Sequence, residues 1–177
     1  MAANLISLVF DTNILLSLSI ALVFSGSYLI KGGFRSSIYV DAFQFFVMFA
    51  GFIIIIVVSI ISFGGYNFLQ QNLPETHLSI TGRTSPAFII VWFLIALWTF
   101  ADPGFHQRCY AAKSGKIAKK GILISIIFFA LFDFLTTSTG LYAKAVLPDL
   151  AQPMMAYPLF AEKVLGSGLK GIFYAAM

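Results

Sequence analysis

The stretch IYVDAFQFFVMFAGFIIIIVVSIISF, from Ile38 to Phe63, decides the fold. Asp41 is its one charged residue. About 20 apolar residues in a helix cross the hydrocarbon core of a bilayer, and this stretch is longer. Its Ile and Val run would favour a strand in water, but a membrane barrel strand is about 10 residues long and alternates polar with apolar side chains. The stretch does neither, so we expect a membrane-spanning helix.

The composition of the whole chain agrees with this expectation. Of the 177 residues, 59% are hydrophobic and 10% are charged, and the mean hydropathy is +0.92. Soluble domains contain about 25% charged residues, and a chain of this length has too much surface for its volume to bury so much apolar area in water. The net charge of +4 forms no basic face interleaved with aromatics, which argues against nucleic-acid binding. We expect the lipid bilayer as a partner and no nucleic acid.

The predicted fold class is all-α, a polytopic helical membrane protein. The apolar segments predict helices at about 13–30, 38–63, 87–107 and 121–146, and the start of a further helix at 168–177. The last segment is too short to cross, so we expect residues 1–177 to be a single transmembrane helical fragment that ends inside a helix. Asp102-Pro103-Gly104 interrupts the third segment, and a break or kink is expected there because proline removes a backbone donor.

The charges of the connecting loops predict the orientation. Basic residues gather in 31–37 and 108–120, whereas 64–86 and 147–167 contain few of them and several prolines. The positive-inside rule therefore places the first two loops in the cytoplasm and the other two outside, in a plasma (cell inner) membrane.

The sequence contains none of the common catalytic motifs. Cys109 is the only cysteine, which rules out an intrachain disulfide and a CxxC metal pair. GxSxG, Walker and HExxH motifs are missing, and neither histidine has a second metal ligand at a suitable spacing. We expect a protein that is not an enzyme and has no cofactor.

Two acidic residues lie in apolar segments. Asp133 stands between Phe132 and Phe134, where an ionised carboxylate costs at least about 2.5 kcal/mol. Such a residue usually faces a bundle interior or a water-filled path, although a protonated or internally bonded carboxyl that fixes helix packing is the alternative. Asp41 is nearer the cytoplasmic end, so a residue at a helix start in the headgroup zone is an equal alternative there.

Hydroxyl side chains follow Asp133. Thr136 and Thr137 lie one helical turn beyond it. They either return hydrogen bonds to the carbonyl four residues earlier or offer oxygen ligands to a hard cation such as sodium.

The break at Asp102 is a second candidate site. Unpaired backbone groups are tolerated at membrane depth only where protein or water satisfies them, and secondary transporters bind their ions and solutes at such breaks. An ordinary helix end at the interface, close to Arg108, is the alternative. Trp98 lies within one turn of the break, where it either lines a cavity or belongs to an interfacial aromatic belt.

Three segments resemble conserved segments of the sodium:solute symporter family. They are GGFRSSIYVDAFQ (32–44), with Val40 where threonine is usual, DPGFHQRCYAAKS (102–114) and LKGIFYAA (169–176). They occur in the family order and span most of the chain. The resemblance implies a fragment of a five-plus-five inverted-repeat bundle of the leucine-transporter type, from the end of core helix three to the start of core helix eight.

The same resemblance implies sodium-coupled symport of a small organic solute by alternating access, with sodium as the coupling ion. Asp41 matches an acidic residue associated with the sodium path, and Trp98 aligns with an aromatic gate of sugar-transporting members. Phe129 replaces the lysine or polar residue that those members use, which argues against their sugar contacts here. Asp133 follows Phe129 by one turn and is expected at the same cavity. A complete sodium site is not expected in this fragment, because the family builds it from helix one and a Ser/Thr pair on helix eight.

Two alternatives to symport stay open. One is a membrane receptor, sensor or non-transporting scaffold on the same helical bundle. The other is a membrane enzyme or scaffold that is unrelated to sodium.

Overall fold

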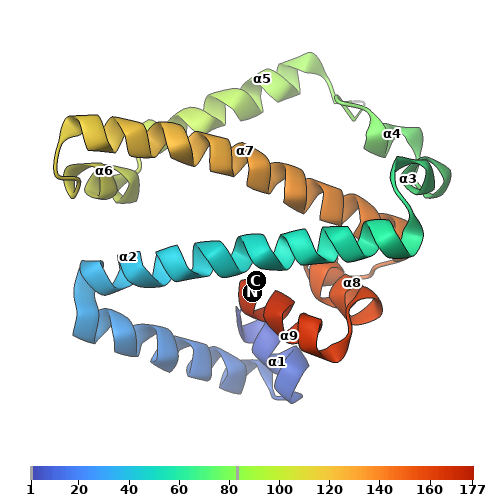
Figure 1. Ribbon diagram of the computed structural model, residues 1–177, viewed down its shortest axis with the longest axis horizontal. Helices are drawn as coiled ribbons and strands as arrows, with labels where there is room; N and C mark the ends of the chain where they lie inside the picture. The colour runs from blue at the N-terminus through green and yellow to red at the C-terminus, as the bar shows by residue number, and fades with distance from the viewer. Residues whose placement is uncertain (1, 83) are drawn as a thin grey trace. The chain divides into compact units, whose positions relative to one another are not determined.

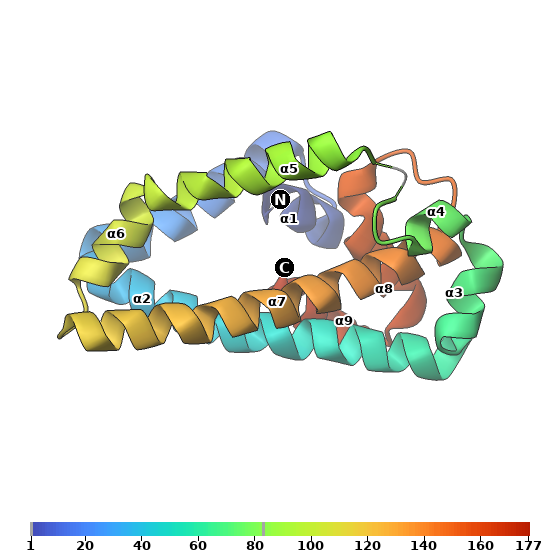
Figure 2. The same ribbon diagram turned by 90° about the horizontal axis from the view of Figure 1, so that it is seen from above.

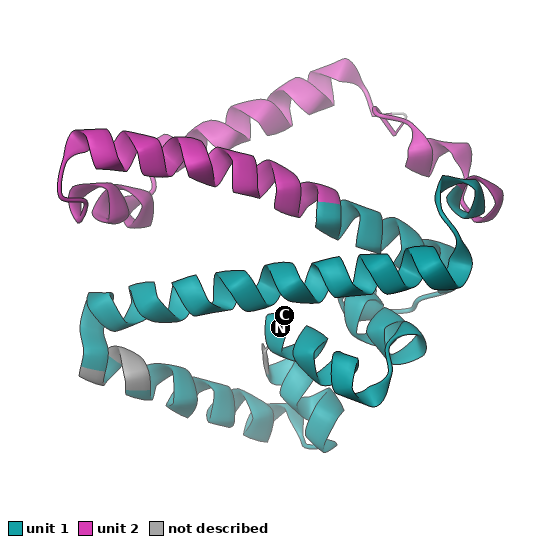
Figure 3. Cartoon of the chain, viewed as in Figure 1, with its two compact units in different colours: residues 1–69, 135–177 teal, residues 70–134 magenta. Residues whose placement is uncertain are grey.

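The computed structural model describes residues 2–82 and 84–177, and every regular element in these ranges is helical. The elements are α1 (Ala2–Phe10), α2 (Ile14–Phe63), α3 (Tyr66–Asn72), α4 (Glu75–Leu78), α5 (Pro86–Ile95), the 3₁₀ helix η1 (Ala96–Phe100), α6 (Pro103–Tyr110), α7 (Gly115–Val146), the 3₁₀ helix η2 (Pro153–Met155), α8 (Ala156–Val164) and α9 (Ser167–Ala176) (Figure 1). The chain divides into two compact units (Figure 3), residues 1–69 with 135–177 and residues 70–134. The predicted all-α class is confirmed.

Among the residues that the structure describes, two helical segments are long and apolar enough to cross a membrane. They are Gly32–Phe63 and Gly115–Val146. Two bent pairs pass the same test together: Ala3–Phe10 with Ile14–Ser27, bent by 120°, and Pro86–Phe100 with Pro103–Tyr110, bent by 46°. These helices confirm the prediction of a helical membrane protein.

A polar corner joins α1 to α2 in the first unit. Asp11 adopts a left-handed backbone conformation at φ 50°, and the Asn13 side chain caps α2 by accepting from the Leu15 N–H at 3.0 Å. The hydroxyls of Thr12 and Ser17 lie 2.8 Å apart, and Ser17 is buried. The first helix predicted from the sequence starts at residue 13, so α1 is an additional helix. Asp11-Thr12-Asn13 precedes an apolar run, which is a common start signal for a helix. In this chain the signal marks the start of α2.

The predicted loop 31–37 is a kink inside α2. Gly33 alone leaves helical geometry, at φ 55° and ψ −153°, a conformation that glycine adopts without a steric penalty. The helices predicted at 13–30 and 38–63 are therefore joined across this residue. Asp41 lies about two turns beyond the kink, so the structure does not support its placement at a helix start.

The core of the first unit forms where α9 lies along α2 (Figure 1). Phe52 of α2 and Phe173 of α9 are buried, and their ring centroids are 5.3 Å apart. The approach is close, because a Cβ added to Gly51 would lie 2.5 Å from the Ala176 Cβ. Burial of these rings supplies the apolar contact that holds the C-terminal helix in place.

Three predicted loops contain helix. α7 begins at Gly115 rather than near residue 121, with the Ser114 hydroxyl accepting from the Ile117 N–H at 3.4 Å. α3 and α4 lie in the predicted external loop 64–86, and α8 lies in 147–167. Charged residues and prolines predict loops in these stretches, but short helices accommodate both.

Candidate functional site

The helix break expected at Asp102-Pro103-Gly104 is present in the second unit, between η1 and α6 (Figure 2). The Asp102 carboxylate caps α6 by accepting from the Phe105 N–H at 2.7 Å, and Pro103 occupies the first turn. On the other side of the break, His106 Nε2 donates to the Phe100 carbonyl oxygen at 2.7 Å. The side chains of Asp102 and His106 thus satisfy backbone groups on both sides of the break, which lets a bent helix persist in an apolar environment.

The aromatic candidates lie on exposed faces of the second unit. The Trp98 side chain is 70% exposed and that of Phe129 is 68% exposed. No residue of α5 or η1 is buried. The described residues therefore form no closed cavity around Trp98. A role for either aromatic ring as a gate or cavity wall stays a prediction.

Asp133 and the two threonines share the continuous helix α7. Asp133 and Thr137 are exposed, and Thr136 is half-buried. The Thr136 carbonyl oxygen accepts from the Tyr157 hydroxyl of α8 at 3.2 Å. Burial raises the pKa of Tyr157, so the phenol stays a neutral donor.

The Thr139 hydroxyl, which also follows Asp133 on α7, returns a hydrogen bond to its own helix. Thr139 is buried, and its hydroxyl donates to the Leu135 carbonyl oxygen at 2.8 Å. Return of a hydrogen bond to the preceding turn satisfies a hydroxyl without any ligand. The use of Thr136 and Thr137 as cation ligands stays a prediction.

The candidate residues are divided between the two units. Asp41, Thr136 and Thr137 belong to the first unit, whereas Trp98, Asp102, Phe129 and Asp133 belong to the second. Asp41 is exposed on the membrane-length segment of α2. Within residues 2–82 and 84–177, no three His, Cys, Asp or Glu side chains come together as a metal site.

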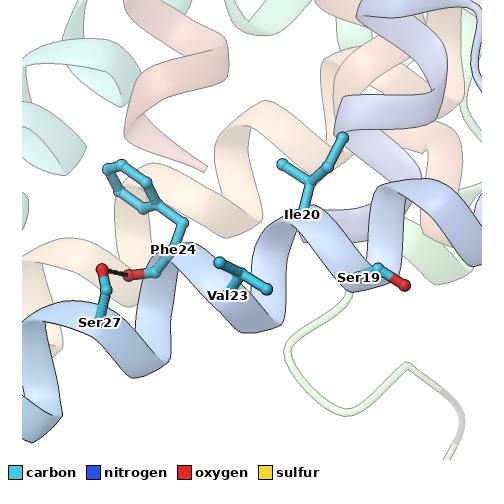
Figure 4. A pocket seen from close by; sticks show the side chains of 5 residues that line it. All are labelled: Ser19, Ile20, Val23, Phe24 and Ser27. Carbon is cyan, nitrogen blue, oxygen red and sulfur yellow. Dashed lines mark hydrogen bonds between the residues drawn. The ribbon is translucent and has the colours of Figure 1, made fainter.

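A shallow hollow lies along the first limb of α2, before the kink (Figure 4). It has a volume of about 410 Å³ and is lined by Ser19, Ile20, Val23, Phe24 and Ser27. The Ser19 and Ser27 hydroxyls donate to carbonyl oxygens of their own helix, at 2.9 and 2.7 Å. The hollow therefore presents an apolar surface. None of the predicted site residues lines it.

Comparison with known proteins decides the family. The model of the sodium:solute symporter family matches residues 1–177. The chain belongs to the sodium:solute symporter family. The family resemblance deduced from the three sequence segments is thereby confirmed. Two of those segments coincide with backbone breaks, 32–44 with the kink at Gly33 and 102–114 with the break at Asp102.

Several sodium symporters and cotransporters are similar to this chain. The sodium/pantothenate symporter of Escherichia coli is 32% identical over 175 residues, covering 94% of this chain and 35% of its own length. The corresponding symporter of Haemophilus influenzae is 28% identical, covering 85% and 33%. Human sodium/glucose cotransporter 4 is 23% identical, covering 99% and 32%. The chain thus spans about a third of the length of these relatives. No solved structure matches it.

The residues that connect the helices to one another were not among the predicted site residues. Asn13 could have been found from the Asp-Thr-Asn signal. Tyr142 hydrogen-bonds to the residue that ends α2, and Gly51 leaves room for α9. Neither residue could have been found from the sequence, because their roles depend on distant parts of the chain.

Proposed function

We propose that this chain is part of a secondary active transporter that couples uptake of a small organic solute to sodium by alternating access. The observation that carries the proposal is the family match along the whole chain. The names of the relatives state sodium symport with pantothenate and sodium cotransport with glucose. Further support comes from the bent helix at Asp102, since transporters use such breaks to bring backbone polar groups to membrane depth.

Asp133 and Asp41 are proposed to lie along the ion or solute path. Each stands in one of the two membrane-length segments. An ionised carboxylate in such a segment costs at least about 2.5 kcal/mol, so it needs a compensating role. The Thr136 and Thr137 hydroxyls are proposed to supply neutral oxygens beside Asp133, and Trp98 an aromatic wall.

The proposed location is the plasma membrane, with the basic stretches around 31–37 and 108–120 in the cytoplasm. The kink at Gly33 and the start of α7 then lie on the inner side. An inside-negative potential adds about 2.3 kcal/mol per charge per 100 mV to the driving force for sodium entry.

The test is solute uptake by the full-length protein in proteoliposomes. Pantothenate is the first solute to supply, because the Escherichia coli and Haemophilus influenzae relatives are named for it. Glucose serves as the second. We expect accumulation that requires an inward sodium gradient. Uptake that is unchanged when potassium replaces sodium would count against symport.

Asp133→Asn tests the residue that carries most of the site proposal. We expect transport to be lost while expression and thermal stability are retained, because the amide removes the charge and keeps the shape. Asp149→Asn is the matched control, since Asp149 is exposed in the connection after α7. Wild-type uptake by Asp133→Asn would show that the carboxylate is not on the transport path.

A further inference from the structure

Four lysines gather where α7 begins. Lys113 precedes the helix, and Lys116, Lys119 and Lys120 lie in its first two turns. Helical residues three and four apart have Cβ atoms about 5–6 Å from each other, so Lys116 adjoins Lys119 and Lys120 on one face. All four side chains are exposed. We refer to these residues as the lysine cluster.

No acidic residue of this region balances the lysine cluster. The sequence contains no Asp or Glu between Asp102 and Asp133. In the part of the chain that the structure describes, none of the four ammonium groups forms an ion pair. The first turn of α7 also has no acidic residue, although cations are disfavoured there because the helix dipole is positive at that end. Neither ion pairing within the described residues nor helix stability accounts for the cluster.

The other lysines with described side chains are engaged. Lys144 donates to the Pro148 carbonyl oxygen at 2.6 Å, and Lys163 to the Val146 carbonyl oxygen at 3.3 Å. Lys170 forms an ion pair with Glu162 at 2.9 Å. Among the lysines whose side chains are described, those without a partner in the protein are thus confined to one end of α7.

The position of the lysine cluster suits a bilayer surface. α7 is membrane-length, and its apolar run starts at Gly121, directly after Lys120. With α7 crossing a bilayer, the ammonium groups would lie at the level of the lipid headgroups. Tyr110, the last residue of α6, is 84% exposed, and tyrosine is enriched at this level of a membrane.

We propose that the lysine cluster is a binding site for the headgroups of anionic phospholipids. Ammonium groups donate up to three hydrogen bonds each and attract a phosphate as point charges. Each lysine near an anionic membrane surface strengthens binding about fivefold. The site depends on the membrane placement of α7, but it does not depend on sodium-coupled transport.

The test measures lipid binding to the purified full-length protein in a neutral detergent. Short-chain phosphatidylglycerol, short-chain phosphatidylcholine and inorganic phosphate are titrated separately, without sodium. We expect binding of phosphatidylglycerol that weakens as salt is added. Replacing all four lysines by glutamine is expected to weaken it at least about tenfold.

Two further variants make this result specific. The four lysines replaced by arginine should keep phosphatidylglycerol binding, because the charge remains. Lys144→Gln with Lys163→Gln should also leave it unchanged, because these lysines bond to carbonyls at the other end of α7. Equal binding of phosphatidylcholine, equally tight binding of inorganic phosphate in its own titration, or unchanged affinity in the four-glutamine variant would each overturn the proposal. Because sodium is absent, none of these outcomes bears on transport.

Discussion

The Tyr142 hydroxyl donates to the Gly64 carbonyl oxygen at 2.7 Å, although the two residues are 78 positions apart. Gly64 ends α2 with φ 97°, and its own N–H donates to the Ile60 carbonyl oxygen at 3.0 Å. Tyr142 is buried, and its ring stacks on Phe68 with centroids 6.2 Å apart. One tyrosine of α7 thus fixes both the end of α2 and the start of α3.

Tyr142→Phe should destabilise the protein by about 0.5–1.5 kcal/mol, because the ring remains while the Gly64 carbonyl loses its donor. Thermal unfolding of the full-length protein in detergent measures the change. Tyr142→Leu should cost more, since the stacking on Phe68 is lost as well. Equal stabilities of wild type and Tyr142→Phe would show that water or lipid replaces the hydroxyl without cost.

Gly51→Ala should destabilise the protein by about 1–3 kcal/mol, because the new methyl group would overlap Ala176 and push α9 away from α2. Gly26→Ala is the matched control in the same helix, where an added Cβ meets nothing within 4 Å. That change should be neutral or stabilising by up to about 1 kcal/mol, since alanine favours helix. A loss of stability in Gly51→Ala that Gly26→Ala does not show would separate crowding at α9 from a general effect of replacing glycine. A Gly51→Ala protein that unfolds at the wild-type temperature would show that α9 adjusts freely.

Local signals in the sequence were sufficient for the long apolar helices and for the break at Asp102, but not for the short helices α1, α3, α4 and α8. Apolar length indicates a membrane helix, and proline after a capping residue indicates a helix start. The stretch around Gly33 was predicted as a loop because its lysine and arginine separate two apolar segments. In the structure a single glycine provides the turn, and helix continues on both sides.

The packing of the first unit could not be predicted in the same way. The contacts of Tyr142 with Gly64 and of Gly51 with α9 join residues that are far apart in the sequence, and no local pattern encodes them. The candidate site was predicted from single residues on single helices. Asp133 and Asp41 are unusual because of the cost of a charge in lipid, but the partners that make such a charge useful depend on how helices assemble.

Asp102→Ala and Asp102→Asn separate a structural role of Asp102 from a role in transport. Alanine removes the cap on the Phe105 N–H and should cost about 0.5–2 kcal/mol, whereas asparagine caps nearly as well and should retain wild-type stability. Thermal unfolding and sodium-driven uptake are measured on both variants.

The combination of the two measurements decides the role. If Asp102 only caps α6, Asp102→Asn should transport normally. Loss of uptake with full stability in Asp102→Asn would instead place the charge itself on the ion path.

Glu162 and Lys170 form the ion pair that joins α8 to α9, with Nζ and Oε2 2.9 Å apart. Their side chains are 43% and 26% exposed, so solvent screens the attraction and the coupling energy should be at most about 1 kcal/mol. A double-mutant cycle with Glu162→Gln and Lys170→Met, followed by thermal unfolding, measures it. The exchanged pair Glu162→Lys with Lys170→Glu should recover most of the lost stability, because the charges still meet. A coupling of several kcal/mol would mean that the pair is shielded from solvent in the membrane-embedded protein.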